Sequence, residues 1–219
     1  MTTSFDEASS RPLYDSLAKI EIPIPATDIV LTVNYQSPEI IDDEPNARDL
    51  KHFLEASLQV VFQELGKVFQ NENVFSTFWM LQIYAGDKFQ AQGSLMYIPL
   101  NDLKDAYDSE VGSDVRKLFL SRVAHEVGHN LMDEESIPML IELYFLIMTS
   151  YNTRIERIGN ACANNEFPKE YLQGIEQIRK WFNAPDIHTL FANIIKGVIT
   201  LEMILATLKN ESINELKTD

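Results

Sequence analysis

The residues His125-Glu126-Val127-Gly128-His129 lie just past the middle of a 219-residue chain and decide how the rest of the sequence is interpreted. On a helix, four residues turn by about 400° and rise by about 6 Å, so His125 and His129 leave one face a single turn apart. Two imidazoles placed this way can reach one Zn²⁺ at roughly 2.0–2.1 Å. Glu126 points beside the ion and can take a proton from water. These five residues therefore predict a zinc site with a general base.

The sequence before the motif supports its placement on a helix. Ser113 or Asp114 can cap such a helix. Apolar residues then recur at helical spacing, at Val115, Leu118, Phe119, Val123 and Val127. Gly128 lowers the stability of the helix, but because it has no side chain it is expected to leave open space beside the metal.

A catalytic zinc site needs a third protein ligand and one position left open for water. Three candidates follow the motif, namely Glu134, Glu135 and Glu142. Glu142 lies in the very apolar run 137–148, where a buried carboxylate is costly unless it is paired or bound to a cation. Glu134 and Glu135 fall in a turn, where solvation is expected. Glu142 is therefore the preferred third ligand, with Glu135 and Glu134 as alternatives.

The segments around the motif predict an α+β fold. Before it come an extended segment at 20–25, a strand at 29–35, a loop at 37–47, a helix at 49–69, and strands at 75–85 and 90–100. After it come a turn at 133–138, an apolar helix, and helices at 168–182, 186–196 and 200–209. Because Pro99 cannot donate to a sheet ladder, the strand 90–100 is expected at a sheet edge.

Three regions follow from this order. Residues 1–19 read as a flexible leader, 20–132 as a sheet plus the HExxH helix, and 133–219 as a helical subdomain that carries the third ligand. The sheet is expected to be small and mixed, with a backing helix and an active-site helix, followed by an all-helical C-terminal half.

The composition limits the kinds of molecule that the chain is expected to bind. The net charge of −15 argues against binding to nucleic acid and to anionic membranes, while 45% hydrophobic and 23% charged residues are typical of a globular protein. Cys162 is the single cysteine, so no disulfide can form within the chain. The first twenty residues lack an apolar run, so a cytoplasmic protein without a signal peptide is expected. The oligomeric state is left open.

The motif and the residues after it resemble a known group of zinc peptidases. The segment 125–129, a short turn and then Pro138-Met-Leu-Ile-Glu142 look like the gluzincins, the thermolysin-like clan, and most of all like the minigluzincins. The resemblance implies a zincin-like order over 29–150: a strand, a backing helix, two strands with the last at the edge, the HExxH helix and a glutamate-bearing helix. It also implies that His125, His129 and Glu142 hold Zn²⁺.

The resemblance extends to a tyrosine in the C-terminal half. Tyr171 matches a position where that clan often has a tyrosine or histidine that stabilises the oxyanion. A tyrosine that packs between helices is the alternative interpretation, and Tyr144 and Tyr151 are other candidates for the role.

Some positions depart from the gluzincin pattern. Leu143 follows the glutamate where glycine is common, and Leu146 stands where an acidic partner of the histidines is expected. The motif also resembles that of the metzincins, a group with glycine three residues after the second histidine and histidine or aspartate six after it. This chain has Met132 and Glu135 at those two positions.

Together these features predict a zinc metallopeptidase that hydrolyses a peptide or protein substrate with metal-activated water. Glu126 is the expected base, Tyr171 the oxyanion donor, and the strand 95–100 the edge along which an extended peptide pairs. The alternative is a catalytically silent or latent zinc-binding module with a regulatory role. Glu126 favours the enzyme, because a structural zinc site has no use for a general base.

Overall fold

The computed structural model describes residues 17–23, 30–36, 44–68, 81–92, 95–131 and 134–215. Most of the expected leader and residues 75–80 of an expected strand lie outside these ranges. The described part is a mixed α+β structure rich in helix, as the sequence predicts. None of its helices has the length and apolar character needed to cross a membrane.

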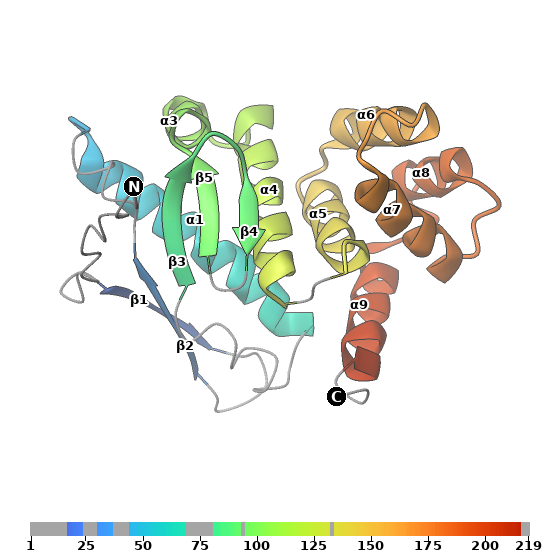
Figure 1. The fold of residues 1–219 in the computed structure, drawn as a ribbon, viewed down its shortest axis with the longest axis horizontal. Coiled ribbons are helices and arrows are strands. Elements are labelled where there is room, and N and C mark those ends of the chain that lie inside the picture. The colour runs from blue at the N-terminus through green and yellow to red at the C-terminus, as the bar shows by residue number, and fades with distance from the viewer. Residues whose placement is uncertain are drawn as a thin grey trace, which may run out of the picture.

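The described strands form one mixed sheet in the order β1-β2-β3-β5-β4. Their bounds are β1 (Leu17–Pro23), β2 (Val30–Gln36), β3 (Leu81–Gly86), β4 (Gln90–Gln92) and β5 (Leu95–Pro99). Strands β2, β3 and β5 run parallel, while β1 and β4 pair antiparallel at the two edges (Figure 1). The proline-containing first strand thus lies at an edge, where proline is tolerated.

The expectation that the strand containing Pro99 lies at the edge is wrong. The segment 90–100 contains two strands, and β5 pairs with β3 on one side and with β4 on the other. Pro99 is the last residue of β5 and directly precedes α3 (Leu100–Asp108). Its missing N–H therefore falls where the ladder ends, so the proline does not exclude an interior strand. Among the described strands, β4 forms the edge on this side of the sheet.

Helix α1 (Ala47–Val68) crosses one face of the sheet, and α4 (Asp114–Leu131) lies beside β4 and β5 (Figure 1). The side chains of Leu54, Leu58 and Phe62 on α1 are fully buried. They recur every four residues, so they form one apolar face that packs into the core. This packing holds the helix that carries the histidine motif against the sheet.

The C-terminal half consists of helices in the described residues. Their bounds are α5 (Ser136–Met148), α6 (Asn152–Ala163), α7 (Lys169–Trp181), α8 (Ile187–Ile195) and α9 (Leu201–Glu215). Helices α5, α7 and α8 match the sequence expectations closely, and α9 continues beyond its expected end at 209. Helices α3 and α6 are not among the individual helices expected from the sequence.

Helix α5 contacts both α4 and α7, and two glycines permit this close packing. A Cβ at Gly128 on α4 would lie 2.8 Å from the Cα of Pro138, and one at Gly174 on α7 would lie 3.1 Å from the carbonyl carbon of Glu135. The space beside Gly128, expected from the sequence to be open, is thus filled by α5. Both neighbouring helices therefore fix the position of the first turn of α5.

This close approach predicts a specific cost for Gly128→Ala. The new Cβ would clash with the backbone of Pro138, so we expect the free energy of unfolding to fall by about 1–3 kcal/mol, the usual range for overpacking. Denaturant unfolding followed by circular dichroism measures it. Gly66→Ala is the matched control, because a Cβ there meets no atom within 4 Å; it should be neutral or stabilising by up to about 1 kcal/mol. An equal loss in both variants would contradict the packing argument.

Candidate metal centre

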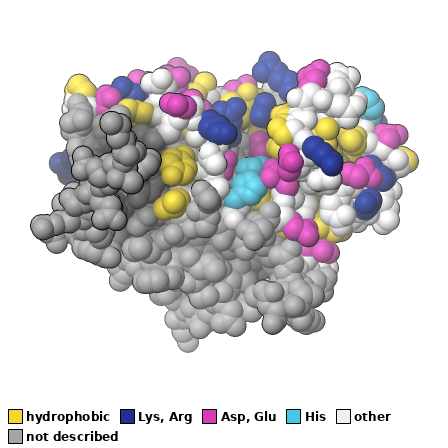
Figure 2. Space-filling model, in the orientation of Figure 1, with side chains coloured by type: hydrophobic (Ala, Val, Ile, Leu, Met, Phe, Trp, Pro, Cys, Tyr) yellow, Lys and Arg dark blue, Asp and Glu magenta, His cyan; other side chains and the backbone are white. Residues whose placement is uncertain are grey.

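Helix α4 presents His125 and His129 one turn apart on the side that faces α5 and α7. The two Nε2 atoms lie 3.1 Å apart, and the rings meet edge to face with 4.8 Å between their centroids. Both side chains are largely buried, since His125 is 12% exposed and His129 24%. Figure 2 shows the histidine surface near the centre of one face of the molecule, next to an acidic surface.

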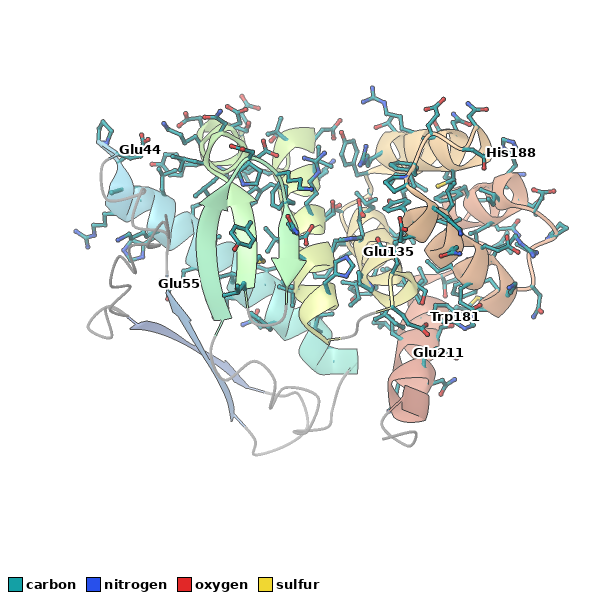
Figure 3. The ribbon with its side chains drawn as sticks, viewed as in Figure 1. Glu44, Glu55, Glu135, Trp181, His188 and Glu211 are labelled. Atoms are coloured by element: carbon teal, nitrogen blue, oxygen red, sulfur yellow. The ribbon has the colours of Figure 1, made fainter. Side chains whose placement is uncertain are left out.

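Glu135 completes this pair into a triangle. Its Oε1 lies 3.4 Å from Nε2 of His125, and its Oε2 lies 3.3 Å from Nε2 of His129. Among the described residues, these three form a group whose ligand atoms all lie within 4.8 Å of one another. Glu135 directly precedes α5 (Figure 3), and its carbonyl accepts a hydrogen bond from the amide of Met139 at 3.2 Å. The start of α5 therefore aims this carboxylate at α4.

The chemistry of this group suits a divalent ion. The two Nε2 atoms lie 3.1 Å apart, and each approaches a different oxygen of Glu135, His125 at 3.4 Å and His129 at 3.3 Å. With one ligand atom from each residue, the three atoms all lie within 4.8 Å of one another. Two imidazole nitrogens and one carboxylate are a common ligand set of catalytic zinc. The residues present therefore fit such an ion in donor type and in proximity.

Glu142 lies behind His125 and apart from this triangle. Its Oε2 is 3.2 Å from Nδ1 of His125, the ring nitrogen that does not face Glu135, and the residue is 5% exposed. Burial alone would raise the pKa of Glu142, but the contact with His125 and the charge of Arg154 lower it below its usual range. The carboxylate is therefore ionised and lies against Nδ1 of His125.

The His125 ring is surrounded by negative charge. Burial disfavours its charged form, but the neighbouring carboxylates of Glu135 and Glu142 outweigh this effect and raise the pKa of His125 to about 10. Glu126 contributes in the same direction. Three carboxylates around one imidazole create a strong demand for a cation at this point.

Glu126 follows His125 on α4, lines a cavity together with it and is 7% exposed. Burial raises the pKa of Glu126 to about 7. A carboxylate with a pKa near neutrality is well suited to accept a proton and return it. Glu134, by contrast, is exposed, as the sequence predicts, and its Oε2 accepts a bond of 3.5 Å from the hydroxyl of Ser136.

The three candidate tyrosines have different surroundings. The ring of Tyr171 stacks on Phe167 with 4.3 Å between centroids and lies 6.4 Å from the ring of His125. The hydroxyl of Tyr144 donates to Glu64 on α1 at 2.8 Å, and Tyr151 packs under the ammonium of Lys117. Of the three, Tyr171 lines a cavity with His125 and Glu126.

This cavity has a volume of about 410 Å³. It is lined by Asp87, Lys88, Phe89, Pro99, Asp102, Arg122, His125, Glu126, Glu142 and Tyr171. The sequence does not single out Arg122, although it lies four residues before Glu126 and so on the same face of α4. Phe89 and Asp102 come from the β3–β4 turn and from α3, and only the tertiary structure brings them here.

The arrangement defines a candidate metal-binding centre, with two histidines and a glutamate around one point and a buried acid and a tyrosine beside them. No protein-family model matches the chain, and comparisons with curated proteins and with solved structures give no match either. Function is therefore inferred from the residues of this centre.

The geometry predicts that the three glutamates contribute differently to metal binding. We expect Glu135→Ala to lose stoichiometric zinc, since it removes one corner of the triangle. Glu142→Gln keeps an oxygen behind His125 and should retain one ion per chain with ~10–100-fold weaker affinity, the usual effect of disturbing an outer partner. Calorimetric titration of metal-free protein with zinc measures both.

Glu134→Ala serves as the control in the same turn, because the side chain is exposed and should leave the affinity unchanged. The opposite result, with zinc lost in a Glu142 variant and kept in Glu135→Ala, would favour the gluzincin-like ligand set.

Proposed function

We propose that the chain is a zinc-dependent peptidase that holds Zn²⁺ with His125, His129 and Glu135. The observation that carries this proposal is a buried glutamate, Glu126, which follows His125 on α4 and lines the same cavity, next to a group of His125, His129 and Glu135 whose ligand atoms lie within 4.8 Å of one another. Zinc held there would supply Lewis acidity, which makes water more acidic and polarises a carbonyl group.

In this proposal Glu126 moves the proton. It takes a proton from the attacking water and later gives it to the leaving amine of the cleaved peptide bond. Glu126 is 7% exposed and borders the cavity together with His125, so its carboxylate can exchange a proton with a molecule bound there. A structural site gains nothing from such a group.

Glu142 and Tyr171 act on either side of this base. Glu142 contacts Nδ1 of His125 at 3.2 Å, so it fixes which ring nitrogen faces Glu135 and His129. Tyr171 lines the same cavity, and its hydroxyl is the proposed donor to the oxyanion that forms at the attacked carbonyl. Burial raises the pKa of Tyr171, so the hydroxyl keeps its proton for donation.

The proposed ligand set differs from the gluzincin resemblance at its third member. Glu135 stands six residues after His129, which is the position of the third ligand in the metzincins. The Glu142 position, which corresponds to the gluzincin ligand, has the role of an outer partner instead. The proposal therefore keeps the zinc peptidase chemistry and changes which acid completes the centre.

An extended peptide is proposed to pair with the sheet edge next to this centre. The edge is β4, in place of the 95–100 segment expected from the sequence, and β4 packs against α4. An edge strand offers unpaired main-chain groups, so a peptide backbone can add to it without regard to side chains. This placement would bring a substrate alongside the helix that carries His125 and Glu126.

Glu126→Gln tests the enzyme against the silent binding module. Size and hydrogen-bonding reach are kept and the base is removed, so zinc content and thermal stability should stay near wild type. Hydrolysis of a peptide selected from a mixed-sequence library should fall by ~10²–10⁴-fold, the range expected for a general base. If the wild type binds zinc and cleaves nothing in the library, the regulatory-module alternative replaces the enzyme.

Tyr171→Phe tests the oxyanion donor. It removes one hydroxyl and keeps the stacking on Phe167, so we expect kcat to fall by ~10²-fold with little change in KM. Tyr144→Phe is the matched control, because its hydroxyl binds Glu64 on α1, and its kcat should stay at the wild-type value. Steady-state kinetics on one peptide measure both, and an unchanged kcat in Tyr171→Phe would reduce this tyrosine to a packing role.

A further inference from the structure

Arg122 is a fixed cation in the wall of the cavity beside the metal centre. Its Nη1 lies 3.0 Å from Oδ2 of Asp102, and its guanidinium carbon lies 5.5 Å from the centroid of the Phe89 ring. The side chain is 37% exposed and lines the cavity. A guanidinium carries five N–H donors in a rigid fork. Among the described residues, Asp102 is the acceptor at one end of this fork, so the rest of it remains for a ligand.

The position of Arg122 relative to Glu126, the proposed base, limits which residue of a bound peptide Arg122 can contact. Arg122 lies four residues before Glu126 on α4, which is about 6 Å along the helix axis. An extended peptide advances by roughly 3.3–3.6 Å per residue. A group bound by Arg122 therefore belongs to a residue one or two positions from the bond at Glu126, and the C-terminal carboxylate of a peptide can reach it only from the side beyond that bond.

Arg122 and Lys88 are the lysine and arginine side chains that line the cavity. Lys88 is exposed next to Asp87, whereas Arg122 pairs with Asp102, and its charge also acts on Glu126 and Glu142. Zinc at the metal centre would supply two further positive charges beside these acids, so a ligand carboxylate can face the guanidinium. The guanidinium is already held by Phe89 and Asp102, so a ligand would not bear the cost of immobilising it.

We propose that Arg122 binds a carboxylate of the substrate one or two residues beyond the scissile bond, which makes it a specificity-determining residue. This inference rests on the proposed peptidase activity. Arginine suits the role because its planar fork can engage two carboxylates on different edges, here Asp102 and the substrate. The carboxylate can be the C-terminus of a peptide or an acidic side chain, and the substrates below separate these two sources.

The experiment uses zinc-loaded full-length protein and one peptide sequence that the wild type cleaves. The peptide is made with a free carboxyl end one or two residues after the cleaved bond, with an amide end, and with an amide end plus glutamate or glutamine at that residue. We expect the carboxylate peptide to have a kcat/KM ~10–100-fold above its amide, in the range of a charge-assisted hydrogen bond. A gain restored by glutamate in the amide series would identify the side chain as the source.

Arg122→Gln should bring the ratio of kcat/KM for the carboxylate peptide to that for the amide peptide close to one, and Arg122→Lys should restore part of this ratio. Arg157→Gln is the control, because that arginine is exposed on α6. Peptide affinities of the Glu126→Gln protein, measured by calorimetry, should show the same ranking without turnover.

The outcomes separate the two proposals. A wild type that holds zinc and treats carboxylate and amide peptides alike overturns the role of Arg122 and leaves the peptidase standing. A protein that neither retains zinc nor binds either peptide overturns both.

Discussion

The close packing of the first turn of α5 against both α4 and α7 is the constraint on which the centre depends. Gly128 and Gly174 permit it, since a Cβ at Gly128 would collide with the backbone of Pro138 and one at Gly174 would press on Glu135 and Met139. Glu135 directly precedes α5, and Glu142 lies about two turns further along this helix. The position of α5 therefore brings both acids to α4. The histidine motif supplies one wall of the site, and the position of α5 supplies the other.

The electrostatics of this placement have a consequence for the fold. Glu126 and Glu142 are buried, and Glu135 adds a third carboxylate around two imidazoles. Burying ionised groups is costly unless they are paired. Protonation of His125 offsets part of this negative charge, and the pKa of His125 is raised for this reason. A divalent ion between the three donors would neutralise more of this negative charge and would link the sheet-bearing half to the helical half.

The sequence predicts most of the architecture and part of the centre. The helix of His125, Glu126 and His129 follows from spacing alone, as do most of the helices after it. The choice between Glu135 and Glu142 does not, because residues about two turns apart on α5 face α4 together. The way α5 approaches α4 determines which carboxylate lies against Nε2 of His125 and which lies against Nδ1. The prediction of the sheet edge is wrong for a similar reason. Pro99 ends β5, but its presence does not show that β4 pairs with β5 on the other side.

The cavity is what distinguishes the proposed enzyme from a binding module. A structural zinc site closes its fourth position with a protein ligand and needs no open volume. Here His125 and Glu126 both border a cavity of about 410 Å³, and the same cavity is lined by the Arg122 guanidinium, which contacts an aromatic ring and an aspartate. Pockets that bind small ligands combine apolar walls with a few convergent polar groups, and Phe89, Pro99 and Tyr171 supply such walls. The same helix, α4, carries two of the three donors, the base and the cation, so metal binding, proton transfer and substrate selection would share one support.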